Sequence, residues 1–126
     1  MAPLRVLLVD DDRDDADLTR LALLDTGFAL DIRVVSRRDA LAAALEGFTP
    51  RLVLCDLNFP GWPYPEIRAA LSTMAPDAGF VLLTGALPHD GNLPEADAVL
   101  LKGQLRQLPG VLQRLVPGLD GRPHAD

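Results

Sequence analysis

The sequence predicts an α/β fold in which helices cover both faces of a parallel sheet. Five short apolar runs alternate along the chain with segments of helical periodicity. Four of these runs are continuously apolar, which is typical of strands buried on both faces. The runs that we predict as strands are RVLLV (5–9), LDIRVV (30–35), RLVLC (51–55), FVLL (80–83) and AVLL (98–101).

Helical spacing of apolar residues follows the first, second, third and fifth runs. Glycines, prolines and a capping-box pattern supply the expected ends. The first predicted helix ends before Gly27. The second runs from Ser36, which forms a capping box with Asp39, to Gly47, and the third begins near Pro65. The last helix carries Leu105, Leu108, Leu112 and Leu115, with Pro109 in its first turn after a short irregular lead-in.

The connection between the fourth and fifth strands is the exception. Residues 85–98, GALPHDGNLPEADA, contain two prolines and two glycines and have weak periodicity. Only a short helix, or none, fits there. We therefore predict a doubly wound five-stranded parallel sheet with a shortened or irregular fourth helix.

Length and composition limit the possibilities further. The 126 residues suit a single domain (1–126), with a core over about 4–116 and a flexible tail at 117–126. No apolar run approaches the roughly 18–20 residues that span a bilayer, and the first residues lack the pattern of a signal peptide. With one cysteine, Cys55, a cytoplasmic location is the expectation.

The charge of the chain argues against nucleic acid as a direct partner. The net charge is −6, and the longest basic stretch is the pair Arg37 and Arg38. Of the 12 cationic residues only Lys102 is a lysine. This suggests that position 102 needs a compact ammonium group, and not the planar guanidinium of arginine.

Polar residues follow four of the predicted strands. Asp10 and Asp11 follow the first, Asp56 the third, Thr84 the fourth and Lys102 the fifth. The carboxyl ends of parallel strands lie on one edge of a sheet, so these groups are expected to converge. Clustered carboxylates suit Mg²⁺, and a carboxylate can form an aspartyl phosphate.

With these residues at the strand ends, the chain resembles the receiver domains of response regulators. The similar segments are LLVDDD, VLCDLNFPG, FVLLTGA and AVLLKGQLRQL. The resemblance implies the flavodoxin-like strand order 2-1-3-4-5 and a place in a bacterial two-component or phosphorelay system. It also implies a protein that catalyses its own phosphorylation and dephosphorylation and is not a turnover enzyme on an external substrate.

The resemblance assigns roles to single residues. Asp56 would be the phospho-acceptor, with Thr84 and Lys102 as its catalytic partners. Mg²⁺ would be held by Asp10, Asp11 and Asp56 and by the main-chain carbonyl of Asn58. The implied partners are a histidine kinase or a histidine phosphotransfer protein, together with an unknown downstream protein. No nucleic acid and no membrane is expected, and a homodimer stays open.

Four features depart from the receiver pattern. Gly103 stands where receivers usually have proline, and Val99 stands where many have an aromatic residue. Thr84 and Lys102 are only 18 positions apart (102 − 84). The loop after Asp56 reads FPGWPYPE. Trp62 and Tyr64 in this loop could either pack against the domain or be exposed for contact with a partner, and the sequence does not decide between the two.

Two other functions remain open at this stage. A receiver could work by docking alone, without phosphorylation. A Mg²⁺-dependent phosphatase or dehalogenase with an aspartyl nucleophile is a third class, although LLVDDDRDD fits the pattern of such enzymes poorly.

The remaining aspartates near the first strand have a structural explanation. Asp12 is expected to cap the first helix, with Asp15 at the third helical position. Asp14, Asp15 and Asp17 are expected to complement the helix dipole and to face solvent.

Overall fold

The computed structural model describes residues 3–87, 90–91 and 94–116. Its five strands form one parallel sheet in the order β2-β1-β3-β4-β5, which confirms the predicted order. Because every neighbouring pair is parallel, all five strands end at the same edge. The strands are β1 (Leu4–Val9), β2 (Leu30–Val35), β3 (Leu52–Asp56), β4 (Gly79–Thr84) and β5 (Ala98–Leu101).

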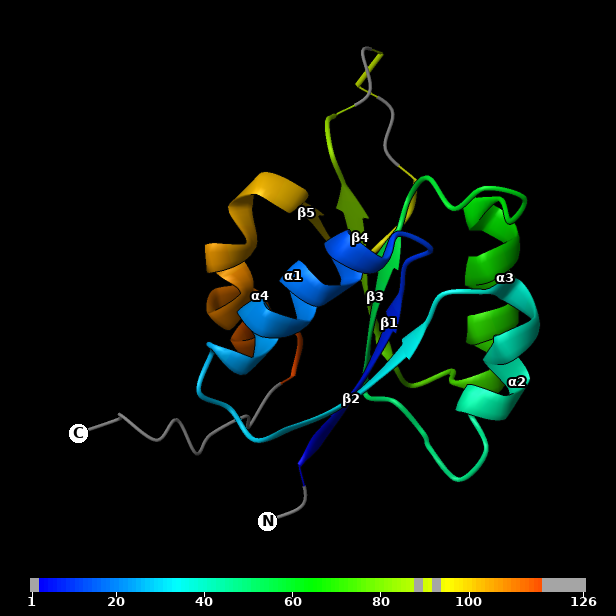
Figure 1. The fold of residues 1–126 in the computed structure, drawn as a ribbon, viewed down its shortest axis with the longest axis horizontal. Helices are drawn as coiled ribbons and strands as arrows, with labels where there is room; N and C mark the ends of the chain where they lie inside the picture. Colours follow the sequence, from blue (N-terminus) through cyan, green and yellow to red (C-terminus); the bar gives the residue numbers. More distant parts are fainter. Residues whose placement is uncertain (1–2, 88–89, 92–93, 117–126) are drawn as a thin grey trace.

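Helices cover both faces of the sheet. In Figure 1, α1 and α4 lie on one side of the sheet and α2 and α3 on the other. The α-helices are α1 (Arg13–Leu24), α2 (Leu41–Ala44), α3 (Tyr64–Met74) and α4 (Leu108–Leu115), and two 3₁₀ segments, η1 (Arg38–Ala40) and η2 (Lys102–Gln107), precede α2 and α4. None of the helices in the described part of the chain is long and apolar enough to cross a membrane.

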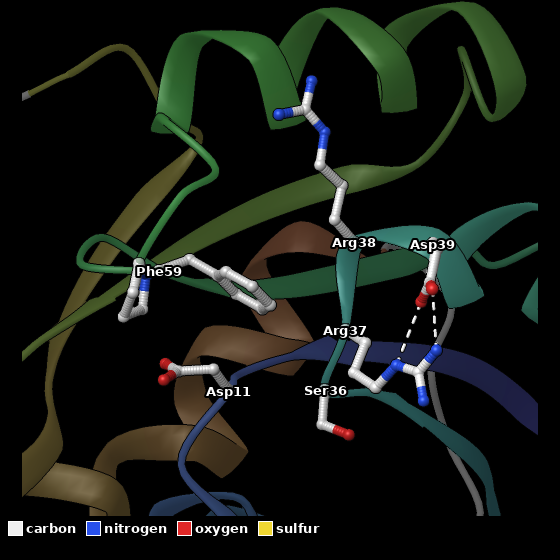
Figure 2. A pocket seen from close by; sticks show the side chains of 7 residues that line it. Asp11, Ser36, Arg37, Arg38, Asp39 and Phe59 are labelled. Atoms are coloured by element: carbon white, nitrogen blue, oxygen red, sulfur yellow. Dashed lines mark hydrogen bonds and ion pairs between the residues drawn. The ribbon is translucent and has the colours of Figure 1, made fainter.

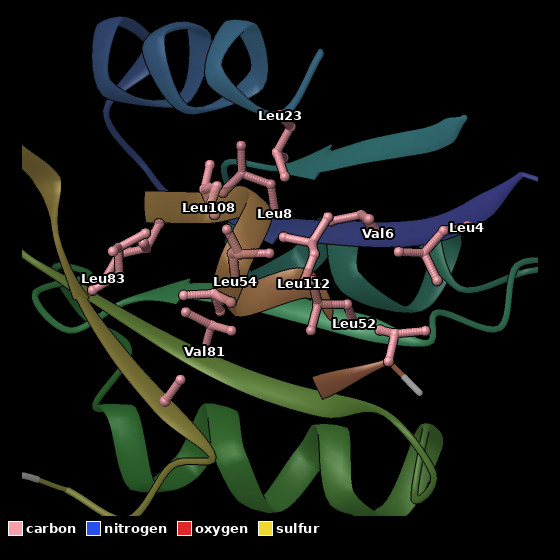
Figure 3. Close-up of a cluster of buried hydrophobic side chains, with 14 of the residues drawn as sticks. Leu4, Val6, Leu8, Leu23, Leu52, Leu54, Val81, Leu83, Leu108 and Leu112 are labelled. Atoms are coloured by element: carbon pink, nitrogen blue, oxygen red, sulfur yellow. The ribbon is translucent and has the colours of Figure 1, made fainter. Parts of the chain in front are cut away.

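The alternation of side chains along β1 divides the core in two. Val6 and Leu8 join the cluster beneath α1 and α4, which Figure 3 shows. Leu7 and Val9 join the cluster beneath α2 and α3. All four side chains are fully buried, since a strand between two helical layers has no solvent face. The apolar run of residues 6–9, VLLV, follows directly from this position.

The weak periodicity after Thr84 has a structural counterpart. Among residues 85–87, 90–91 and 94–97, which the structure describes, none is helical. This agrees with the expectation of a short fourth helix or none. The predicted flexible tail, 117–126, lies outside the described residues.

Some predicted details at the helix ends were wrong. Ser36 does not cap the second helix: the residue before η1 is Arg37, and no side chain caps that helix end. The helix after β2 is also shorter than expected, because α2 ends at Ala44. The prediction that the third helix begins near Pro65 is confirmed, because α3 begins at Tyr64 and Pro65 occupies the second helical position.

The aromatic residues after β3 are packed, which decides the question that the sequence left open. Trp62 and Tyr64 are 3% and 4% exposed, respectively. The ring of Trp62 meets Phe59 edge to face at 5.2 Å, and Tyr64 meets Phe80 at 5.8 Å. The Tyr64 hydroxyl donates to the carbonyl of Glu95 at 2.8 Å. The start of α3 is thereby tied to the connection between β4 and β5.

Removing that hydroxyl tests its contribution. We expect Tyr64→Phe to lower the free energy of unfolding by about 1 kcal/mol, because a part-buried carbonyl loses its donor. The measurement is equilibrium denaturation with urea. Thr73→Ala is a control on the same helix, because it removes an exposed side-chain bond to Ala69. Equal stability losses in the two variants would contradict a special role for Tyr64.

Candidate functional site

The ends of β1, β3 and β5 place three charged side chains in contact. Asp10 follows β1 directly, Asp56 is the last residue of β3, and Lys102 follows β5 directly. Asp10 is fully buried and Asp56 is 5% exposed. The Lys102 Nζ lies 3.2 Å from one Oδ2 of each aspartate. The structure thus brings together three residues that are far apart in the sequence.

Both buried aspartates use their two oxygens in the same way. Asp10 Oδ1 accepts the N–H of Asp12 at 3.0 Å, and Asp56 Oδ1 accepts the N–H of Asn58 at 3.1 Å. In each case the second oxygen, Oδ2, accepts from Lys102. These local turns fix the carboxylates at the strand ends, because the side chain bonds its own backbone two residues on.

Lys102 has a third carboxylate partner, which the sequence analysis missed. Its Nζ lies 2.8 Å from Asp15 Oδ2, the shortest of its three contacts. Asp15 does lie in the first turn of α1, as expected, but its side chain is only 40% exposed and contacts the site, which the sequence analysis did not predict. Helical side chains lean toward the N-terminus of their helix, so a carboxylate in the first turn of α1 can reach the sheet edge. That direction is the signal that could have identified Asp15.

The charges in the site are unbalanced. Burial lowers the pKa of Lys102, but the hydrogen bond with Asp15 and the charges of Asp56 and Asp10 outweigh it, so the net pKa is raised. Burial raises the pKa of Asp10 to about 6, and the charge of Asp56 adds to that rise, while the Asp12 N–H and Lys102 oppose it. One ammonium does not neutralise this group of carboxylates.

Three of the carboxylates are arranged so that they could hold a metal ion. Ligand oxygens of Asp10, Asp11 and Asp56 all lie within 4.8 Å of one another. Asp11 is the most exposed of the three, so it leaves the group open to solvent. Hard carboxylate oxygens with room for water fit Mg²⁺, so the residues present are suited to the ion.

Asp12 caps helix α1 and is not one of the three aspartates, Asp10, Asp11 and Asp56, that could hold a metal ion. Its Oδ1 accepts the N–H of Asp15 at 3.1 Å, which makes it the N-cap of α1. The predicted division between cap and strand-end aspartates is confirmed for this residue.

The remaining predicted site residues are less directly engaged. Thr84 lies beside Leu101 in the pairing of β4 with β5, and its hydroxyl donates to the carbonyl of Ala86 at 2.8 Å. Asn58 is exposed, and its N–H is bonded to Asp56. The proposed role of its carbonyl as a metal ligand stays a prediction.

The cysteine beside the site is not a nucleophile. Cys55 is fully buried in β3, and burial, together with the charges of Asp56 and Asp10, raises the pKa of its thiol to about 12. A thiol in this state stays protonated and packs as a small apolar group.

An open hollow of about 720 Å³ lies beside Asp11. It is lined by Asp11, by residues 36–39 at the end of β2, and by Phe59 and Pro60. In Figure 2 the guanidinium of Arg37 turns toward Asp39 and away from Asp11. Arg37 donates two hydrogen bonds to the Asp39 carboxylate, at 3.0 and 2.7 Å. Arg38 points away toward α3, where it pairs with Glu66. Neither arginine neutralises Asp11 in this arrangement.

The fold is that of response-regulator receiver domains. A receiver domain protein from Methanospirillum hungatei shares 23% identity and a TM-score of 0.72, with 90% of this chain and 94% of that one covered. Chemotaxis protein CheY4 of Vibrio cholerae shares 24% identity and a TM-score of 0.74 over 91% of this chain and all of that one.

A third similar structure is the response regulator TrrA of Thermotoga maritima, which was crystallised in complex with Mg²⁺-BeF. It shares 22% identity and a TM-score of 0.74, with 90% of this chain and 99% of that one covered. No protein-family model and no curated protein sequence matches this chain. The likeness to these solved structures therefore lies in the fold.

The division of the aspartates predicts different effects for two neighbouring substitutions. Asp11→Ala should weaken Mg²⁺ binding about tenfold or more, because it removes one carboxylate of the metal group. Asp12→Ala should leave Mg²⁺ affinity nearly unchanged but lower the free energy of unfolding by about 1 kcal/mol, because α1 loses its cap. Titration with Mg²⁺ and urea denaturation measure the two effects. Equal losses of Mg²⁺ affinity would show that the cluster is divided wrongly.

The raised pKa of Asp10 predicts a pH-dependent stability. Because its pKa in the folded protein, about 6, lies above its ordinary value of 3.8, the folded state holds the extra proton and loses stability as pH rises from about 4 to 6. Asp10→Asn keeps the acceptor for Asp12 and removes this effect. In EDTA at neutral pH we expect it to be more stable than the wild type by up to about 3 kcal/mol, the value that linkage gives for a pKa shift from 3.8 to about 6.

Near pH 4 the wild type and Asp10→Asn should have similar free energies of unfolding, because in the folded protein the Asp10 carboxyl group is then protonated and, like the asparagine amide, neutral. Thermal or urea denaturation at the two pH values is the measurement, and exposed Asp31→Asn is the control for loss of one charge. A difference between wild type and Asp10→Asn that does not change with pH would contradict the assignment to Asp10.

Proposed function

We propose that this chain is a receiver that accepts a phosphoryl group on Asp56 from a histidine kinase or a histidine phosphotransfer protein. The observation that carries the proposal is the contact of a single lysine with the strand-end aspartates of β1 and β3. An ammonium and a group of carboxylates suited to Mg²⁺, set around one carboxylate, are what phosphoryl transfer requires.

The reaction assigns one role to each residue. A carboxylate oxygen of Asp56 attacks phosphorus, the bond from phosphorus to the donor imidazole nitrogen breaks, and the imidazole leaves with the electron pair. Lys102 balances charge on the phosphoryl oxygens, and Thr84 donates to one of them after its hydroxyl turns from Ala86. Mg²⁺, held by Asp10, Asp11 and Asp56 and by the Asn58 carbonyl, would supply further neutralisation of the phosphoryl charge.

The output would be transmitted by protein contacts with an unidentified downstream partner. The net charge of −6 supports a protein target over a nucleic acid. We further propose a cytoplasmic protein of a bacterial two-component or phosphorelay system, which catalyses its own phosphorylation and dephosphorylation.

A receiver that works by docking alone is the second candidate. Two observations favour it: the described residues between β4 and β5 contain no helix, and Val99 stands where many receivers have an aromatic residue. The contacts of Lys102 with Asp10 and Asp56 favour phosphorylation, since docking alone does not need them.

One experiment separates the candidates. The protein is incubated with Mg²⁺ and acetyl phosphate, or with a histidine kinase and ATP, and phosphate that is stable in acid and labile in base is counted. We expect label in the wild type and none in Asp56→Asn, because an amide cannot form the acyl phosphate. Asp31→Asn, an exposed change of the same kind on β2, should label like the wild type.

Absence of Asp56-dependent label with every donor would overturn the proposal in favour of docking. Continuous release of phosphate from an added phosphoester would instead support the phosphatase.

A further inference from the structure

Asp15 stands apart from the other carboxylates that Lys102 contacts. It comes from α1, whereas Asp10 directly follows β1 and Asp56 is the last residue of β3. It lies outside the group suited to a metal ion, which consists of Asp10, Asp11 and Asp56. Its distance to Nζ, 2.8 Å, is nevertheless shorter than the 3.2 Å to either of the others.

The three contacts account for all the donors of the lysine. An ammonium has three N–H bonds, and Lys102 has one carboxylate for each. Two of these carboxylates would be occupied during the reaction. Asp10 and Asp56 would bind Mg²⁺, and Asp56 would also carry the phosphoryl group. Lys102 would then be repelled by the ion held at the same carboxylates.

Asp15 is the partner that stays available. Its side chain is 40% exposed, and it faces the ammonium from the helix side. We propose that Asp15 is a positioning residue: it holds Lys102 in the site when Mg²⁺ is bound, so that the ammonium can balance charge on the phosphoryl group. This inference rests on the proposed function and adds to it a residue in α1 that contacts neither the ion nor the phosphoryl group.

The chain offers a matched control and a direct readout. Asp14 lies in the same first turn of α1, is exposed, and has no bond to Lys102. Asp14→Ala therefore removes the same charge from the same turn. Because Lys102 is the sole lysine of the sequence, acylation of a lysine by acetic anhydride reports on this one ammonium. Peptide mass spectrometry separates it from the N-terminal amine.

The first arm measures access to Lys102 at saturating Mg²⁺. We expect Asp15→Ala to acylate about tenfold faster than the wild type, because a charge-assisted bond is lost, and Asp14→Ala to match the wild type. The second arm measures the rate of Asp56 phosphorylation by acetyl phosphate. We expect about a fivefold or greater fall in Asp15→Ala, partial rescue in Asp15→Glu, and no change in Asp14→Ala.

Each outcome decides something. Unchanged acylation in Asp15→Ala, or faster acylation with an unchanged or higher phosphorylation rate, would overturn the positioning role. Equal effects of Asp14→Ala would also overturn the positioning role, because they would show that the loss of any negative charge from the first turn of α1 has this effect. If the wild type takes no phosphate, the proposed function fails, and the acylation arm alone decides whether Asp15 holds Lys102.

Discussion

The contact between Lys102 and the carboxylates at the strand ends is the interaction on which the site depends. Asp10 is fully buried and Asp56 nearly so, and a buried charge without a partner is costly. One ammonium serves both aspartates and also reaches Asp15, so it links β1, β3 and α1 to the end of β5. Arginine would not suit this position, because three carboxylates around one point require a compact group of three donors.

Much of the fold could be predicted because the inner strands of the sheet are buried on both faces. Such a strand is apolar over most of its length, as β3 is, whereas the edge strand β2 is partly exposed and its sequence, LDIRVV, contains charged residues. All five strands were predicted within one residue of their observed ends. The helix ends were harder to predict, since they depend on local competition. The predicted capping box needed the side chain of Asp39, but Asp39 instead forms an ion pair with Arg37 at 2.7 Å. The burial of Trp62 depends on Phe59 and the core beneath α3, contacts that periodicity does not reveal.

The site was predictable for the same topological reason, but only in part. Residues at strand ends converge in any parallel sheet, which is why Asp10, Asp56 and Lys102 could be grouped from positions far apart in the sequence. Asp15 could not be found in this way, because it reaches the site by the direction of a helical side chain and not by its place in a strand. A first-turn aspartate already has a satisfactory explanation in the helix dipole, and that explanation hid its contact with Lys102.

The electrostatics of the site and its chemistry are two aspects of one arrangement. Lys102 contacts the carboxylates of Asp10, Asp15 and Asp56, and Asp11 adds a fourth carboxylate close to Asp10 and Asp56. The pKa of Asp10 is raised to about 6 mainly by burial, and repulsion from Asp56 adds to that rise. A site optimised for stability alone would contain fewer charges, because replacing a buried carboxylate by a neutral group removes that repulsion. The excess negative charge would instead favour a divalent cation beside Asp56, as the proposed function requires. Under the proposed function, Mg²⁺ would offset the repulsion among these carboxylates, so the raised pKa of Asp10 and the proposed metal site arise from the same acidic residues.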